Sequence, residues 1–240
     1  MIGALLWTGV IPWRGSSASD AIPFHVAEAG ALAAVRADLG GTWSALGGLG
    51  FDERNATVVP AATLATFLGP NCSATPVPGG PVSPVLVIPS FAGSFASGLA
   101  PSWVVLVSSG DAGSLVVVQV LNRSAQPVAE VGGSNCGLGG PGGQPLPSGT
   151  LDSPSIAGTA WEGWGSSWVK VEPSLTSLTL AAFGSGTYSG VSGAGVWGIL
   201  YSACNPLLGG PLNEVAFFAT FNLTTGQFTD SSSLTLGCPS

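Results

Sequence analysis

Two apolar runs separated by a short glycine-rich turn constrain this fold most. Residues 102–109 and 114–122 are dominated by Val and Leu, and the segment between them reads Gly-Asp-Ala-Gly. β-Branched runs on either side of such a turn predict a β-hairpin. Neither run alternates between apolar and polar residues, so we expect both faces of the hairpin to be covered. The two runs are therefore predicted to be central strands of a two-layer body.

The rest of the chain from about Thr57 also favours β structure. The remaining strands are expected at residues 168–172, 175–183, 196–203, 214–223 and 227–229. A turn at residues 224–226 joins the last two of these runs. An Ala-rich stretch with apolar residues three and four positions apart predicts one helix near residues 22–39, although Gly30 leaves an extended alternative open. The sequence thus predicts an all-β, two-layer antiparallel β-sandwich with one short helix, formed by residues 20–240.

The first 19 residues form a separate segment in this interpretation. With a period of two, Leu5, Trp7, Ile11 and Trp13 lie on one face, and a Gly/Ser-rich linker follows Arg14. Residues 1–19 are therefore predicted to be an apolar, strand-like arm and its linker. Two interpretations stay open: an edge strand folded onto its own domain, or an arm that pairs with a neighbouring subunit.

The low charge and the short apolar runs exclude nucleic acid and a membrane span, respectively. Only 7% of the residues are charged, against about 25% in an average soluble domain, and the net charge of −7 repels phosphate. Nucleic acid is therefore not expected as a partner. No apolar run approaches the roughly 20 residues that a helix needs to cross a bilayer, so no membrane span is expected either.

Cysteine and asparagine patterns favour the cell exterior. None of the four cysteines sits in a C-x-x-C pair, and the favoured pairing is Cys72 with Cys136 and Cys204 with Cys238, with four free thiols as the alternative. Asn-linked glycans are predicted at the four Asn-x-Ser/Thr sites, which are Asn55, Asn71, Asn122 and Asn222. Glycans would hydrate a surface that has few charges. We therefore expect an extracellular or cell-surface protein.

No motif indicates catalysis, a metal or a cofactor. His25 is the single histidine, which rules out a His-rich metal site, and residues 190–194 only approximate a Gly-x-Ser-x-Gly motif. The cluster Asp52-Glu53-Arg54 is predicted to be a solvated turn. We expect a protein that is not an enzyme and that carries no cofactor.

Two further functional interpretations rest on residue types alone. An acidic β-sandwich with few charges is broadly similar to the glutamic peptidases, and by residue type Gln119 and Glu214 would be the catalytic pair in an acid-stable hydrolase. Trp161, Trp164 and Trp168 could form a platform for sugar, but burial in the core or in a subunit contact is favoured.

Over its whole length, the composition resembles that of archaeal extracellular filament subunits of the thread and bundling-pilus type. The arm with Leu5, Trp7, Ile11 and Trp13 carries the rest of this resemblance. It implies a homopolymer in which a terminal strand of one subunit completes the sheet of the next, with those four side chains inserted. Exposed apolar area on a chain without a membrane span independently favours contacts between copies. A surface-layer or viral coat protein is the remaining alternative.

Overall fold

The computed structural model describes residues 20–68, 71–80, 82–91, 93–110, 114–132, 144–171, 177–188, 191–202 and 214–236. Within these residues the chain forms a nine-stranded sheet with the order β11-β10-β9-β8-β1-β5-β6-β7-β3 and a separate two-stranded sheet of β2 and β4. All neighbouring strands are antiparallel. The strands are β1 Trp43–Glu53, β2 Thr57–Pro60, β3 Ser73–Pro76, β4 Val85–Ile88, β5 Ser102–Ser109, β6 Leu115–Leu121, β7 Ser124–Gly132, β8 Ser177–Tyr188, β9 Val191–Ser202, β10 Glu214–Asn222 and β11 Phe228–Leu236.

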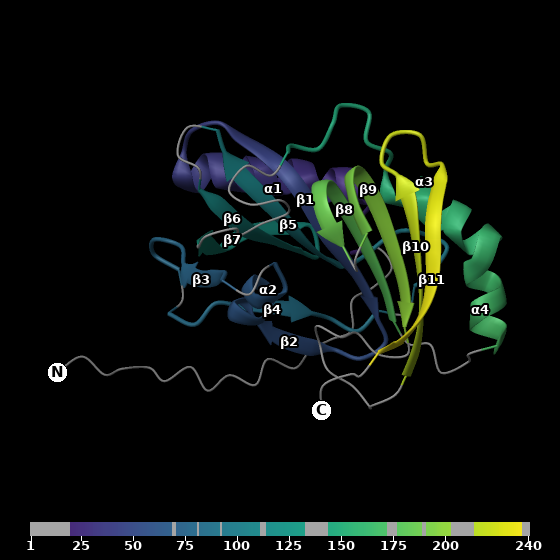
Figure 1. Ribbon diagram of the computed structural model, residues 1–240. Helices are drawn as coiled ribbons and strands as arrows, with labels where there is room; N and C mark the ends of the chain where they lie inside the picture. The colour runs from purple at the N-terminus through teal and green to yellow at the C-terminus, as the bar shows by residue number, and fades with distance from the viewer. Residues whose placement is uncertain are drawn as a thin grey trace.

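Helices and the small sheet cover the two faces of the large sheet (Figure 1). The helical elements are α1 Phe24–Leu39, α2 Ala61–Leu68, α3 Ser153–Ala160, the π-helical turn η1 Trp161–Gly165 and α4 Ser166–Val171. Helix α1 packs on one face over β1, β5, β6 and β7. The small sheet and α2 lie on the opposite face, while α3 and α4 flank β10 and β11. The predicted all-β class with sandwich-like layers is confirmed, although the second layer is only two strands wide and there are more helices than the one expected.

The sheet separates two apolar cores. Alternate residues of β5 point to opposite sides, so Trp103 and Val105 join the core under α1 whereas Val104 and Leu106 join the core under α2 and the small sheet. The predicted hairpin is confirmed as β5 and β6, paired from Ser102–Leu121 to Ser108–Leu115. Both strands are buried except at the half-buried Ser108 and Leu121, as their continuous apolar sequence predicts.

The central strand β1 is built around glycines. A Cβ at Gly50 would come within 2.6 Å of the Trp103 ring, and one at Gly48 would come within 2.5 Å of the Phe24 ring. Two large rings therefore lie directly against the backbone of β1. The expectation that β structure begins near Thr57 is wrong, because the first strand begins at Trp43. Glycine has low β-propensity, and the glycines of β1 therefore conceal this strand in the sequence.

Helices α1 and α3 begin at one shared carboxylate. The Oδ1 atom of Asp152 accepts hydrogen bonds from the backbone N–H groups of Ser153 (2.9 Å) and His25 (3.0 Å). The Ser153 hydroxyl accepts a bond from the Phe24 N–H (2.9 Å) and donates to the Gly98 carbonyl (2.7 Å). These contacts satisfy first-turn N–H groups that each helix leaves unpaired. They explain why α1, predicted near residues 22–39, begins after Pro23, whose side chain cannot form such a bond.

The predicted strand at residues 168–172 is wrong. Residues 166–171 are helix α4, which continues α3 and η1 into one helical segment that begins at Ser153, after the N-cap residue Asp152. Its N-terminal signal is the sequence Asp-Ser-Pro, an N-cap residue followed by proline in the first turn. The expected strands in the last third of the chain correspond to β8, β9, β10 and β11.

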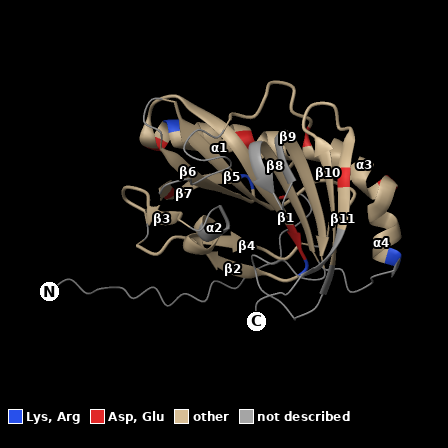
Figure 2. Ribbon diagram, viewed as in Figure 1, with Lys and Arg blue, Asp and Glu red and all other residues tan. Residues whose placement is uncertain are grey.

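Charged residues are sparse over the whole ribbon (Figure 2). Across the described part of the chain, one ion pair forms, between Arg54 and Asp52. No described helix combines the length and the apolar character that a bilayer span requires.

Candidate functional site

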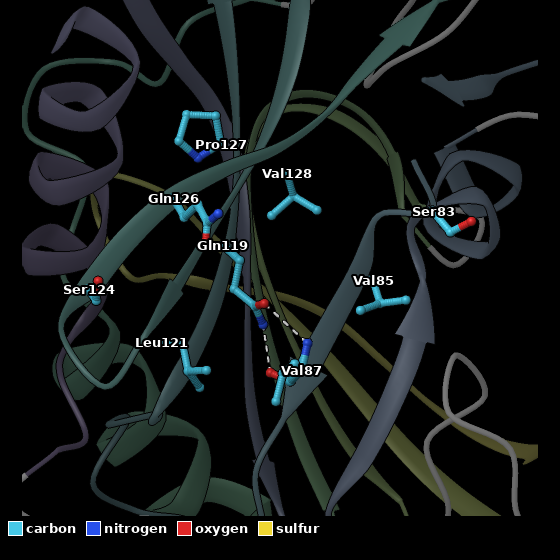
Figure 3. Close-up of a pocket in the computed structure, with 9 residues that line it drawn as sticks. All are labelled: Ser83, Val85, Val87, Gln119, Leu121, Ser124, Gln126, Pro127 and Val128. Atoms are coloured by element: carbon cyan, nitrogen blue, oxygen red, sulfur yellow. Dashed lines mark hydrogen bonds between the residues drawn. The ribbon is translucent and has the colours of Figure 1, made fainter. Parts of the chain in front are cut away.

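A groove of about 350 Å³ lies between β4 and the β6–β7 hairpin, on the face of the large sheet opposite α1 (Figure 3). It exists because the small sheet is narrower than the sheet beneath it, so the end of the β6–β7 hairpin is left uncovered. The lining residues are Ser83, Val85 and Val87 near β4, Gln119 and Leu121 from β6, and Ser124, Gln126, Pro127 and Val128 from β7.

Gln119 ties one side of the groove to β4. Its Oε1 atom accepts a hydrogen bond from the Val87 N–H (3.1 Å) and its Nε2 atom donates to the Val87 carbonyl (2.6 Å), as the dashed lines in Figure 3 show. The Ser102 hydroxyl donates to the same carbonyl (3.0 Å). The Gln119 amide thus makes the pair of main-chain contacts that a neighbouring strand would otherwise make with Val87.

The lining is neutral and mixed in character. Its polar groups are the amides of Gln119 and Gln126 and the hydroxyls of Ser83 and Ser124, and its apolar groups are mostly valine and leucine side chains. None of the described residues that line the groove carries a charge. Such a surface suits uncharged hydrogen-bonding groups next to aliphatic side chains, the combination that a peptide backbone with apolar side chains presents.

Gln119 and Glu214 do not form the pair expected for a glutamic peptidase. Gln119 is on β6 and Glu214 is on β10, and β5, β1, β8 and β9 lie between them in the sheet. At about 4.8 Å per strand, five steps separate them by roughly 24 Å. The Gln119 amide is also engaged with β4.

Asp52, Glu53 and Arg54 are not the solvated turn that their sequence predicts. Asp52 is 0% exposed and Glu53 is 6% exposed. Both are the last residues of β1, where they pair with β8, and Glu53 also forms a bridge with Ser90 after β4. Arg54 binds Asp52, donates to the Phe91 carbonyl (2.6 Å) and the Gly93 carbonyl (3.0 Å), and thereby holds the segment after β4 against the end of β1.

The second carboxylate oxygen of Asp52 is buried and has no hydrogen-bond partner within the described chain. Burial raises the pKa of Asp52 to about 6, while the charge of Arg54 and its hydrogen bond act in the opposite direction. The carboxyl group can therefore change its charge in a mildly acidic solution. Its place behind Arg54, which also binds the Phe91 and Gly93 carbonyls, suits a structural clamp.

His25 lies exposed at the start of α1. Burial raises the pKa of the nearby Glu28, His25 lowers it, and Asp152 raises it further. No group of three or more His, Cys, Asp or Glu side chains suited to a metal occurs within the described ranges.

The three tryptophans of the helical segment pack against the sheet. Trp164 stacks on Phe228 of β11 with ring centroids 4.4 Å apart, and Trp168 lies 5.4 Å from Phe217 of β10. Trp161 lies 6.4 Å from Tyr201 of β9. All three side chains are half-buried, which agrees with the favoured packing role rather than with an open platform for sugar.

Three of the four predicted glycosylation asparagines are exposed, namely Asn55, Asn71 and Asn122. Asn222 is half-buried, and its Oδ1 atom accepts hydrogen bonds from the N–H groups of Thr224 (3.0 Å) and Thr225 (3.0 Å). The Thr224 hydroxyl, which completes this site in the sequence, is also bound to Asn222 (3.1 Å). The geometry thus favours the first three positions over Asn222.

Several predicted residues lie outside the described residues. These are Leu5, Trp7, Ile11 and Trp13 of the arm and the cysteines Cys136, Cys204 and Cys238. Cys72 lies directly before β3, whose Ser73 is opposite Gly132 of β7, four residues before Cys136. The Cys72–Cys136 and Cys204–Cys238 pairings remain predictions.

No family model, no curated protein and no solved structure matches this chain. The groove and the Arg54 clamp therefore have to be interpreted from their own chemistry. Gln119 had a usable signal in the sequence: it is the one polar residue inside the apolar run of β6, and a buried amide needs partners.

Proposed function

We propose that this protein is a non-enzymatic structural subunit of an extracellular homopolymer, joined by insertion of the N-terminal strand of one copy into the next. The observation that carries the proposal is the incomplete second layer. The small sheet ends at β4 with a groove beside it, and strand addition requires an open strand edge next to pockets for alternate side chains.

Composition supports the same function. Low charge makes a solvated monomer surface unusual, and valines at positions 58, 82 and 85, on or beside the small sheet, are 48%, 90% and 42% exposed. Contact with another copy would cover them. In this proposal glycans at Asn55, Asn71 and Asn122 hydrate the remaining surface, and disulfides suit the oxidising exterior.

Removal of residues 1–13 tests the proposal. We expect the shortened chain to be secreted and folded, with an unchanged circular dichroism spectrum, and to form no filaments in electron micrographs. Two full-length double variants test whether the apolar face of the arm, and not merely its length, is required. Trp7→Ser with Trp13→Ser changes that face and should abolish filaments. Ala4→Ser with Thr8→Ser changes the opposite face and should not. Filaments formed by the shortened chain would contradict the proposal.

A further inference from the structure

We propose that the groove beside β4 is the acceptor for a short stretch of residues 4–13 of a second copy of this chain, which enters as a third, antiparallel strand of the small sheet. This inference rests on the proposed function and assigns the acceptor residues and the direction of the inserted strand.

The first support is an open main-chain edge at Val85. The Pro84 carbonyl faces β2, since it accepts a hydrogen bond from the Ala61 N–H (2.9 Å). Successive residues of a strand direct their N–H and C=O groups to opposite sides, so those of Val85 face away from β2. Val87 has the same orientation, and its two groups bind Gln119. The main-chain groups of Val85 have no hydrogen-bond partner within the described chain.

The second support is the floor beneath that edge. Gln119 is directly opposite Gln126, and Leu121 is directly opposite Ser124, so these four side chains lie on one face of the β6–β7 hairpin. A strand added about 4.8 Å from β4 would lie above them. It would bond to Val85 through its main chain and to the Gln126 amide through hydrogen bonds, and every second side chain would point to the floor.

The volume and charge of the groove indicate what it takes. A volume of about 350 Å³ is at the small end of the usual range for binding pockets, about 300–1,000 Å³, so the groove holds a short stretch of chain. The lining residues that the structure describes have no charged side chain, and residues 1–13 have none either. Within that segment Leu5, Trp7, Ile11 and Trp13 fall on one side of an extended chain and Ala4 and Thr8 on the other, although Leu6 and Val10 also lie on the second side.

The direction of β4 favours a second copy over the chain's own arm. The described chain starts at Asp20, and Ile22 forms a bridge with Ala100, two residues before Ser102. A strand that entered the groove directly from Asp20 would reach it at the Val87 end and would run parallel to β4. All pairings between the named strands are antiparallel. A segment that arrives from the Ser83 end, from another copy, would run antiparallel to β4.

The test measures binding of a fluorescent peptide with the sequence of residues 1–13 to the full-length protein, by fluorescence polarisation below the concentration at which the protein polymerises. Val85→Pro removes the free N–H at the open edge and leaves the pairing with β2 intact. Val58→Pro is the matched control, because Val58 is opposite Val87 and its N–H faces the other edge of the small sheet. We expect Val85→Pro to weaken binding by about tenfold or more and Val58→Pro to leave it within about twofold.

A second pair of variants protects the test against misfolding at a strand proline. Gln126→Lys places a charge at the exposed rim of the groove, and Gln227→Lys places the same charge in the β10–β11 turn. Only the first should weaken peptide binding. The circular dichroism spectrum of each variant confirms folding.

Three outcomes would overturn the inference. Unchanged binding to both Val85→Pro and Gln126→Lys would place the acceptor elsewhere, for example at the outer edge of β11. Equal loss in Val58→Pro would place it at the edge of β2. Absence of binding to the unaltered chain would indicate a groove filled by the chain's own arm or no strand addition. Filaments that persist in any of these cases would leave the proposed function intact, whereas peptide binding at the groove without filaments would contradict the proposed function alone.

Discussion

The buried carboxyl group of Asp52 makes the stability of this protein depend on pH in a direction opposite to that of a typical paired aspartate. Its pKa rises from 3.8 to about 6 on folding because burial disfavours the charged form. The folded state therefore binds a proton more tightly than the unfolded state. The stability that this group contributes is fully present below its unfolded pKa and is lost as the pH rises through about 6.

The size of the effect follows from the shift. A difference of about two pH units, at about 1.4 kcal/mol per unit, corresponds to roughly 3 kcal/mol between acidic and neutral solution. Asp52→Asn keeps an oxygen that can accept the hydrogen bond from Arg54 and removes the titrating charge. We expect this variant to be about 1–3 kcal/mol more stable than the unaltered chain at about pH 7.5 and nearly equal to it at about pH 3.5.

Urea unfolding followed by tryptophan fluorescence measures these free energies of unfolding across the pH range. Asp38→Asn is the control, since Asp38 is an exposed carboxylate on α1. The difference in free energy of unfolding between Asp52→Asn and the unaltered chain should grow between about pH 4 and pH 6, and Asp38→Asn controls for the loss of one negative charge. A difference that is constant over the whole range, or one that grows toward acid, would refute the assignment of the raised pKa to Asp52.

Two further predictions concern close packing and an unpaired hydroxyl. Gly50→Ala should lower the free energy of unfolding by about 1–3 kcal/mol in chemical denaturation, because the new Cβ would lie 2.6 Å from the fully buried Trp103 ring. Gly132 has open space around it, so the control variant Gly132→Ala should change this free energy by less than about 0.5 kcal/mol. Equal effects of the two variants would contradict the packing argument. Tyr201→Phe should leave the melting temperature unchanged or raise it, because the Tyr201 hydroxyl is buried without a hydrogen-bond partner among the described residues, and a marked fall in calorimetry would reveal a partner.

The parts of the fold that the sequence predicts are those with strong local patterns. The continuous apolar runs of β5 and β6 predict a buried hairpin, and the helical spacing after Asp20 predicts α1. Strand β1 has no such pattern, because its glycines are required by the Phe24 and Trp103 rings that pack on it and not by its own backbone. That requirement exists only once distant segments have come together.

The candidate site depends even more on distant contacts. The groove arises because β4 stops short of covering the β6–β7 hairpin, which no local pattern encodes. Likewise, Asp52 and Glu53 follow a glycine-rich run and look like a turn, but the strand continues through both of them and buries them. Gln119 was identified by residue type, and its partner on β4 became evident only from the structure.

The central place of β1 also affects how the chain folds. Its partner on one side, β5, follows about 50 residues later, but its partner on the other side, β8, is far along the chain, with Gly50 opposite Leu180 across 130 residues. During synthesis the first half-sheet can assemble while that second edge of β1 has no neighbour. Because long-range pairing of this kind is slow and leaves an aggregation-prone edge exposed, we expect the nascent chain to need protection until β8 has emerged.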